Sequence, residues 1–266
     1  MNIPQHYTQS NKDAWNKRTM VHIDSEFYDV KSFLEGQSSL HETELSLLGD
    51  VKGKKILHLQ CHFGQDSLSL ARMGAKVTGV DLSDQAIAKA RELNETLGLD
   101  AQFICSDVYE LPQQLEEQFD IVFTSYGVIG WLPDLQRWGR IIDTFLKPGG
   151  QLLLVEFHPA VWMFDTDFTR IQYSYFNTET IVEQSTGTYT DRNADIHYEE
   201  VSWNHSLDEV FAGLLHNGLS ITGFREYDFS HYDCFAHMEK IAERKYIIKP
   251  LGTKMPLMYS VTAEKK

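Results

Sequence analysis

The chain has 266 residues, of which 42% are hydrophobic and 23% charged, and its formal net charge at pH 7 is −14. This composition is typical of a globular protein and excludes a disordered chain. No apolar run approaches the roughly 20 residues that a membrane-spanning helix needs. The acidic charge and the scattered Lys and Arg residues argue against nucleic acid or an anionic membrane as a partner. We therefore expect a neutral or cationic small-molecule substrate.

The N-terminus and the cysteines indicate the compartment. Residues 1–9 lack the basic start and apolar stretch of a secretory signal. The three cysteines, Cys61, Cys105 and Cys234, are too few for a disulfide framework and fit a reducing environment. We expect a cytoplasmic protein that is a monomer or a homodimer.

The first 50 residues mix polar and aromatic side chains and are expected to form a helical cap segment before a main domain over 51–266. Short apolar runs then alternate with amphipathic stretches, and such runs are typical of buried parallel strands. The predicted strands are 56–59, 76–80, 102–105, 119–124 and 151–155. Between them Ser83 is expected to cap one helix and Pro133 to lie in the first turn of another. This alternation predicts a doubly wound α/β sheet.

After the fifth strand the pattern changes. Apolar residues alternate without intervening helices, first at Ile171, Tyr173 and Tyr175 and again around Tyr198. We interpret this as an antiparallel β insertion over about 165–205 that covers the substrate.

The C-terminal part contains one more helix and two more strands. Ser206 and Glu209 have the spacing of a capping box for a helix that Gly218 can end. Residues 219–229 and 257–262 predict a closing antiparallel strand pair.

The turn after the first strand, residues 60–66, is the expected ligand-binding loop, because open α/β sheets bind ligands at the carboxyl ends of their strands. Gly64 allows the backbone to approach a ligand closely. Asp81 ends the second strand, where a carboxylate accepts hydrogen bonds from both ribose hydroxyls. Asp107 follows the third strand and can accept from an adenine amino group. Each aspartate alone is equally expected as a cap or turn residue, but together they favour a nucleoside cofactor.

The dinucleotide glycine fingerprint is absent, which argues against NAD because a pyrophosphate needs several close backbone amides. S-adenosylmethionine (SAM) has no pyrophosphate and demands fewer glycines. A nicotinamide-dependent oxidoreductase remains the alternative enzyme. The non-enzymatic alternative is a module that binds SAM without catalysing a reaction.

The sequence resembles the class I SAM-dependent methyltransferases over about residues 55–262. The resemblance is carried by residues 56–65, 77–83, 119–122 and 146–151, the last with the turn Lys147-Pro148-Gly149-Gly150. It looks like a bacterial subgroup with a Leu-Gln-Cys-His-Phe-Gly first loop. The resemblance implies a Rossmann-like, seven-stranded, mostly parallel sheet with an antiparallel last strand, and an enzyme that transfers a methyl group from SAM to a small molecule.

The resemblance also implies which residues contact SAM. They are Gln60, Cys61, His62, Gly64, Asp81, Leu82, Asp107, Val108, Ser125 and Gly127. Gln60 stands where the family usually has an acidic residue, and its carbonyl oxygen keeps the ability to accept from the SAM amino group.

Methyl transfer requires a positioned nucleophile and, for a hydroxyl or ammonium acceptor, the removal of a proton. His158, after the fifth strand, is the candidate base, with a loop histidine bonded to a backbone carbonyl as the alternative. Tyr126 and Trp131 are expected to line the substrate chamber or to be packing aromatics.

Four N-terminal residues, Trp15, Asn16, Arg18 and His22, are candidates for covering the cofactor, with Arg18 near the SAM carboxylate and packing as the alternative. His58, inside the first strand, is expected in the core. No metal is expected, because the group His231, Asp233, Cys234 and His237 does not have the spacing of a zinc site.

Overall fold

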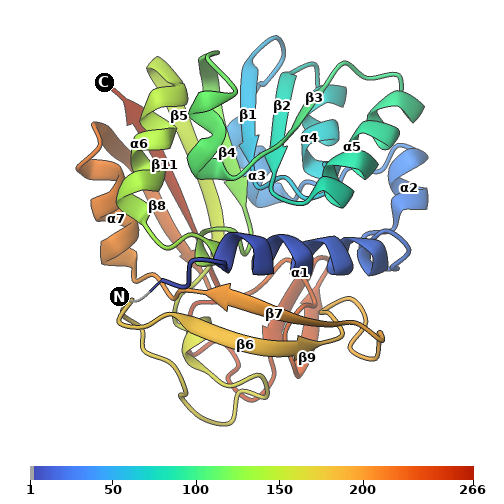
Figure 1. Cartoon of the computed structure of the whole chain (residues 1–266), viewed down its shortest axis with the longest axis vertical. Coiled ribbons are helices and arrows are strands. Elements are labelled where there is room, and N and C mark those ends of the chain that lie inside the picture. The colour runs from blue at the N-terminus through green and yellow to red at the C-terminus, as the bar shows by residue number, and fades with distance from the viewer. Residues whose placement is uncertain (1–2) are drawn as a thin grey trace.

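The computed structural model describes residues 3–266. Its centre is a seven-stranded sheet in the order β3-β2-β1-β4-β5-β11-β8 (Figure 1). The strands are β1 Lys55–Leu59, β2 Lys76–Asp81, β3 Gln102–Cys105, β4 Phe119–Ser125, β5 Leu146–Phe157, β8 Leu219–Tyr227 and β11 Met258–Lys265. Strands β1 to β5 pair in parallel, whereas β11 pairs antiparallel with both β5 and β8. The predicted mostly parallel sheet with a closing antiparallel pair is confirmed.

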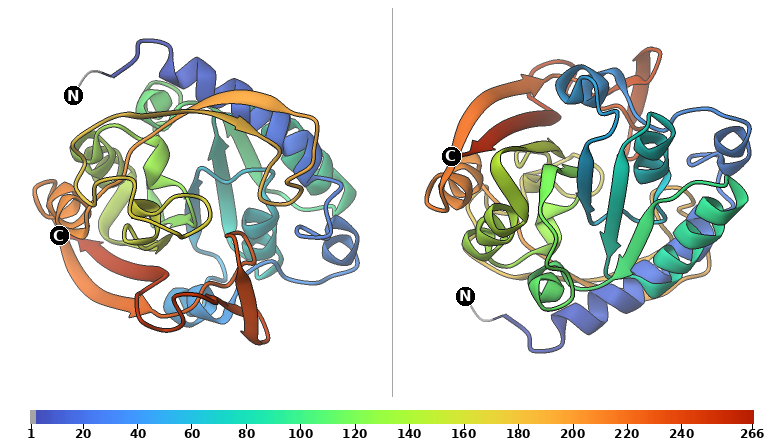
Figure 2. Two further views of the ribbon diagram at one scale, coloured as in Figure 1. Left: turned by 90° about the horizontal axis from the view of Figure 1, so that it is seen from below. Right: turned by 90° about the horizontal axis from the view of Figure 1, so that it is seen from above.

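Helices cover both faces of this sheet, as the two views of Figure 2 show. The helices are α4 Gln65–Arg72, α5 Asp84–Thr96, α6 Leu135–Phe145 and α7 Leu207–Leu215, with the short 3-10 turn η1 Val108–Gln113. Successive strand residues face opposite sides, so Leu57 joins the core under α6 and α7 while Ile56 joins the core under α4 and α5. Both faces of β1 are therefore apolar, which explains its continuous hydrophobic run.

The helix caps follow the sequence signals with two corrections. The Ser83 hydroxyl accepts from the Ala86 N–H, as predicted. Pro133 was expected inside a first helical turn, but Asp134 is the cap of α6, so Pro133 precedes the helix.

The predicted capping box is only half formed. The Ser206 hydroxyl accepts from the Glu209 N–H at 3.3 Å. The Glu209 carboxylate turns instead to Asn177 Nδ2 at 3.0 Å and to His205 Nδ1 at 3.0 Å. A partner far away in sequence has displaced the local one.

The N-terminal segment contains the helices α1 Tyr7–His22, α2 Val30–Leu34 and α3 Glu42–Leu48. Helix α1 crosses the carboxyl ends of the central strands, between the sheet and the hairpin formed by β6 Ile181–Thr186 and β7 His197–Ser202 (Figure 1). The Asn11 side chain binds the backbone of Val201 in both directions, as donor and as acceptor at 2.8 Å. Helix and hairpin therefore form one cover over the strand ends.

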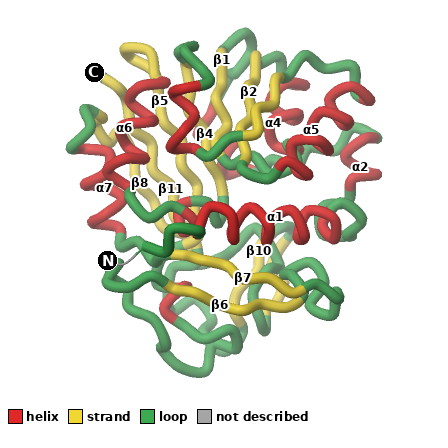
Figure 3. Tube along the Cα trace, in the orientation of Figure 1, coloured by secondary structure: helices red, strands yellow, loops and turns green. Residues whose placement is uncertain are grey.

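The insertion is antiparallel as predicted, but its first strand begins later in the chain. Ile171, Tyr173 and Tyr175 were expected in a strand and lie in a loop after the 3-10 turn η3 Val161–Met163 (Figure 3). The expectation was wrong because alternation predicts a strand only where one face is buried, and Ile171 is 63% exposed. The true pair is β6 and β7, with Ile181 opposite Ser202.

A second hairpin, β9 Met238–Ala242 with β10 Lys245–Ile248, was not predicted. Its residues are mostly charged or exposed, so its pattern resembles that of a loop. Within residues 3–266, no helix is both long and apolar enough to cross a membrane.

Candidate active site

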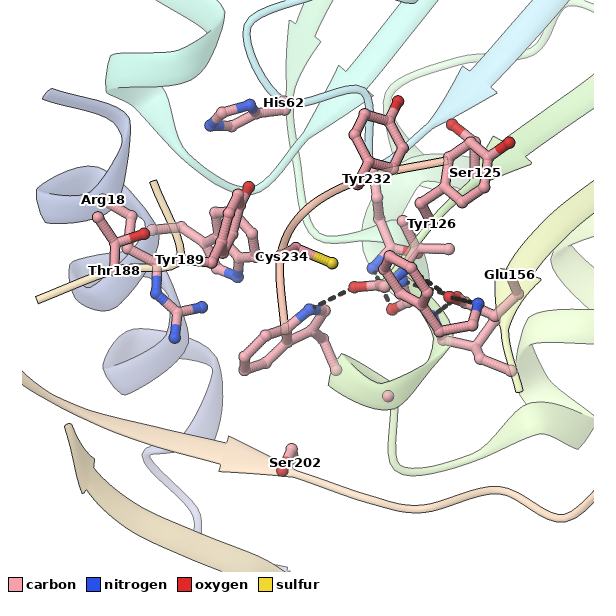
Figure 4. Close-up of a pocket in the computed structure, with 18 of the residues that line it drawn as sticks. Arg18, His62, Ser125, Tyr126, Glu156, Thr188, Tyr189, Ser202, Tyr232 and Cys234 are labelled. Atoms are coloured by element: carbon pink, nitrogen blue, oxygen red, sulfur yellow. Dashed lines mark hydrogen bonds between the residues drawn. The ribbon is translucent and has the colours of Figure 1, made fainter. Parts of the chain in front are cut away.

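The carboxyl ends of the strands open into a cavity of about 1170 Å³, roofed by α1 and the β6–β7 hairpin. Figure 4 shows part of its lining. The residues predicted to contact the cofactor or to wall the substrate chamber all line it, although they come from five separate segments. They are Gln60, Cys61, His62, Gly64, Asp81, Leu82, Asp107, Val108, Ser125, Tyr126, Gly127 and Trp131.

The loop after β1 has an unusual backbone. Gln60, His62 and Gly64 have φ angles of 55°, 52° and 80°, in the left-handed region that disfavours residues with a side chain. Such strain persists only where the surroundings enforce it, and it is concentrated at functional sites. At Gly64 a side chain is also excluded by space, because a Cβ atom would lie 2.7 Å from the Phe103 ring.

The Gln60 side chain is held on one side only. Its Nε2 donates to the backbone oxygen of Val128 at 2.8 Å. Its Oε1 is buried and has no hydrogen-bond partner within the described chain. A buried amide oxygen without a donor is costly, by about 1–3 kcal/mol. The side chain is therefore oriented to accept a hydrogen bond from a bound molecule.

Asp81 joins the ends of β1 and β2. Its Oδ2 accepts from the His62 N–H and its Oδ1 from the Ser83 N–H, both at 2.8 Å. Burial raises the pKa of Asp81 to about 6. A carboxylate offers about four acceptor positions, so two remain for a ligand.

Asp107 combines the two roles that the sequence left open. It caps η1 by accepting from the Tyr109 N–H at 2.7 Å, and it also lines the cavity. Burial raises the pKa of the Asp107 carboxyl.

Glu156 is a site residue that the sequence analysis missed. It is 2% exposed and accepts hydrogen bonds from the N–H groups of Gly127, Val128, Ile129 and Phe157. These bonds hold the segment after β4, where Tyr126 has a φ of 49° (Figure 4). The signal was a glutamate inside the apolar end of β5, a place where a carboxylate needs strong partners.

Arg18 on α1 lies in the cavity wall and already has partners. Its Nε donates to the Tyr198 hydroxyl at 2.9 Å, and its Nη2 pairs with the Glu200 carboxylate. The guanidinium stacks 5.0 Å from the Trp15 ring centroid and 5.3 Å from that of Trp131. Arg18 thus ties the helix to the hairpin.

The other N-terminal candidates also contact the cover and the strand ends. Asn16 Oδ1 accepts from the Ser83 hydroxyl at 2.6 Å, and His22 Nε2 lies 2.6 Å from Thr188 Oγ1. Burial lowers the pKa of His62 to about 3, so this ring is neutral near pH 7.

The structure does not place His158 with the other candidates. It is 5% exposed and is not part of the cavity lining. Its Nδ1 accepts from the Ala160 N–H at 3.1 Å, and its Nε2 lies 3.0 Å from Glu226 Oε1. His158 is thus a loop histidine outside the cavity, held by a backbone N–H and not by the expected backbone carbonyl.

The remaining histidine candidates have protein partners. His58 is buried, with Nδ1 2.8 Å from the Ser67 hydroxyl. In residues 3–266, no group of three or more His, Cys, Asp or Glu side chains is arranged to hold a metal ion.

Comparison with known proteins identifies a domain within the chain and its fold. Residues 56–150 match the family model described as a methyltransferase domain. An S-adenosylmethionine-dependent methyltransferase from Listeria monocytogenes, described as putative, has a similar structure, with a TM-score of 0.61 and 18% identity over 84% of this chain and 96% of that one. Residues 56–150 therefore contain a methyltransferase domain, and the fold of the chain is that of SAM-dependent methyltransferases.

Other comparisons support the same methyltransferase fold. A SAM-dependent methyltransferase structure from Mesorhizobium loti matches with a TM-score of 0.58 and 20% identity, over 87% of this chain and all of that one. An uncharacterised methyltransferase from Synechocystis is 35% identical over 54% of this chain and 66% of its own length. A ubiquinone biosynthesis O-methyltransferase from Coxiella burnetii is 36% identical over 38% of this chain and 43% of its own length. The methyltransferase chain thus spans less than two thirds of each of these two curated relatives.

Proposed function

We propose that the chain binds SAM in the cavity and transfers its methyl group to a small-molecule acceptor. The observation that carries the proposal is the pairing of Gln60 and Asp81 at the ends of the adjacent strands β1 and β2. Both side chains line the cavity and both have acceptor capacity that the protein does not use. The match of residues 56–150 to a methyltransferase domain supports the choice of SAM over a dinucleotide.

The polar groups present suit the parts of SAM. The partner-free Oε1 of Gln60 is able to accept from the ammonium group of the methionine part. The Asp81 carboxylate is suited to the two ribose hydroxyls. Asp107 lies one strand further along the sheet, where the adenine amino group would meet it.

When bound, SAM supplies a methyl group activated by a positively charged sulfur. The residues of the chain bind and orient it, exclude water and remove any proton from the acceptor. The cover of α1 and the β6–β7 hairpin performs the exclusion, because Arg18 and Asn11 hold the two elements together.

The binding test uses calorimetry with SAM, S-adenosylhomocysteine (SAH) and NAD on the wild-type chain and on Asp81→Asn. The ribose hydrogen bonds to a charged acceptor are worth about 1.5–3 kcal/mol, so the variant should bind SAH about tenfold or more weakly. Asp100→Asn, in an exposed loop, is the control and should bind as the wild type does. Binding of NAD in preference to SAH would favour an oxidoreductase and remove the proposal.

Turnover separates an enzyme from a binding module. Methyl-labelled SAM is incubated with the protein and a metabolite extract, and labelled products are separated by chromatography. A labelled small molecule that depends on the protein is expected. Tight SAM binding without any labelled product would identify a non-catalytic module instead.

The proposal also covers the cellular location of the protein, its oligomeric state and its partners. The three cysteines are all free, which fits a reducing cytoplasm. The net charge of −14 favours a small molecule over nucleic acid or an anionic membrane as partner. We propose a cytoplasmic monomer or homodimer, which fractionation and light scattering would test.

A further inference from the structure

A second group of side chains lines the cavity beside the segment after β4. His41 precedes α3, Tyr126 follows β4, and His231 and Tyr232 lie between β8 and β9. We call these four residues the histidine–tyrosine wall, and all four line the cavity. Tyr126 and Tyr232 lie close together in Figure 4, away from Arg18 and Tyr189.

The rings of the wall contact one another. The His41 and His231 rings are stacked, with centroids 4.3 Å apart and planes 6° from parallel. Tyr232 meets His41 edge-on at 4.8 Å and Tyr126 at 5.0 Å. Three elements distant in sequence therefore form one aromatic surface.

The two stacked histidines differ in their hydrogen bonds. His231 Nε2 lies 2.8 Å from the Thr43 hydroxyl and its Nδ1 lies 2.9 Å from the Arg244 backbone oxygen. His41 is 5% exposed, and neither of its ring nitrogens has a hydrogen-bond partner within the described residues. A neutral imidazole has one donor and one acceptor, and leaving such a group buried and unpaired costs about 1–3 kcal/mol. A ligand hydroxyl could satisfy one of the two ring nitrogens of His41, as donor or as acceptor.

The wall carries no full charge near neutral pH. Burial lowers the pKa of His41 to about 2 and also lowers that of His231. Burial raises the pKa values of the Tyr126 and Tyr232 hydroxyls. Glu44, fully buried behind Tyr126, has its pKa raised by burial to about 8 and is therefore mostly protonated.

Charged groups of both signs act on the wall, namely Glu42, Lys245 and Arg244 on His231 and Asp66 on Tyr232. The Arg244 guanidinium donates to the backbone oxygens of Leu40 and Ser38, both at 3.2 Å. Asp66 accepts from the Ser125 hydroxyl at 3.4 Å. Neither sign dominates, so the surface suits an uncharged ring that stacks on aromatic side chains.

We propose that the methyl acceptor is a small, neutral aromatic molecule with a hydroxyl group, and that His41 binds this hydroxyl and accepts its proton. This inference rests on the proposed methyl transfer. It adds the class of the substrate and the residue that accepts the proton. Tyr126 and Tyr232 position the ring of the acceptor. His158 does not take this role, because it does not line the cavity.

The step balances with these groups alone. A lone pair of the hydroxyl oxygen forms the bond to the methyl carbon, and the carbon–sulfur bond breaks with its electrons staying on sulfur. The hydroxyl proton passes to a free nitrogen of His41 and later to solvent. The proton becomes strongly acidic as the new bond forms, so a weakly basic imidazole is sufficient.

The first test measures acceptor binding by calorimetry on the SAH-saturated protein near neutral pH. The probes have similar size and differ in charge or aromaticity: phenol, benzoate, benzylammonium and cyclohexanol. Phenol should bind at least about fivefold more tightly than the others, and His41→Asn should weaken phenol binding about fivefold or more. His216→Asn, an exposed histidine after α7, is the matched control and should leave phenol binding unchanged.

The outcomes distinguish this inference from the proposed function. SAH binding to His41→Asn should stay within about twofold of wild type, which also verifies its fold. Failure of SAH to bind the wild-type chain would remove the proposed function. Normal SAH binding with no preference for phenol, or with phenol binding unaffected in His41→Asn, would overturn the inference alone.

The second test follows turnover with methyl-labelled SAM and a panel of phenols, aromatic amines and carboxylates. The label should appear as a phenol ether, and His41→Asn should lower kcat with SAH affinity unchanged. With a pKa of about 2, His41 is unprotonated near neutral pH, so the wild-type kcat should not fall through its protonation in that range. Label in amines or carboxylates instead, or wild-type kcat in the variant, would contradict the assignment.

Discussion

The Asp81 carboxylate accepts a hydrogen bond from the backbone N–H of His62 at 2.8 Å, so the end of β2 holds the strained loop that follows β1. The same carboxylate faces the cavity. Its ionisation therefore couples two properties, the stability of the fold and the affinity for a ribose.

The pH dependence of these two properties has opposite signs. Folding raises the pKa of Asp81 from 3.8 to about 6 because the group is buried. The native chain thus binds this proton more tightly, and the stabilisation that results is present at low pH and lost as the pH rises from 3.8 to about 6. SAH affinity should behave oppositely and fall below pH 6, by up to about tenfold per pH unit, because the ionised acceptor is lost. Calorimetry between pH 5 and 8 checks this, and Asp81→Asn should bind weakly with a flatter profile.

Glu156→Gln should destabilise the segment after β4. The carboxylate accepts from several backbone N–H groups, among them Val128 at 2.8 Å, and an amide has one acceptor oxygen and brings two donors of its own. The expected loss is about 2–3 kcal/mol, a fall in Tm of roughly 5–10 °C. Thermal unfolding measures it, with Glu95→Gln on the exposed side of α5 as the control. Equal Tm values for the two variants would contradict the structural role of Glu156.

Gly64→Ala should cost more stability than Gly98→Ala. Both glycines have positive φ angles, 80° and 61°, so both variants are strained. Only at Gly64 does a Cβ atom meet a neighbour, the Phe103 ring at 2.7 Å, whereas the space at Gly98 is open. The difference between the two losses in unfolding free energy, about 1–3 kcal/mol, measures the cost of the steric clash at Gly64. Denaturant unfolding of the two variants checks it, and equal costs would mean that Phe103 moves aside freely.

Arg18→Met should loosen α1 from the hairpin. Removal of one partner from a buried ion pair leaves Glu200 uncompensated, at a cost of about 3–5 kcal/mol. Hydrogen exchange across α1 should accelerate, and SAH should bind less tightly because the cover is open. Arg18→Met combined with Glu200→Leu should recover part of the protection, since no unpaired charge then remains. Unchanged exchange in α1 in the single variant would contradict this role.

The sheet could be predicted because its signals are local. Each buried strand is a short apolar run, and Asp81 ends its strand at the edge where ligands bind. The hydroxyl cap of Ser83 is likewise set by residues three positions apart. Such features depend on residues that are neighbours in the sequence, so they can be predicted from the sequence alone.

The rest depends on partners that are distant in the chain. Glu209 leaves its predicted partner for Asn177, and Glu156 finds three of its four backbone donors 27 to 29 residues away. The role proposed for His41 depends on its stacking against His231, which lies on a distant segment of the chain. No local pattern marks these pairs, which exist only once the sheet has brought the segments together.

Strand β11 comes last among the strands along the sequence, yet it lies between β5 and β8. Until the ribosome has released it, β5 has an open edge and β8 has no strand in the sheet with which to pair. Open edges of this kind recruit other chains. During synthesis the sheet therefore stays incomplete until β11 has emerged, and a nascent chain stalled before Met258 would keep these edges open.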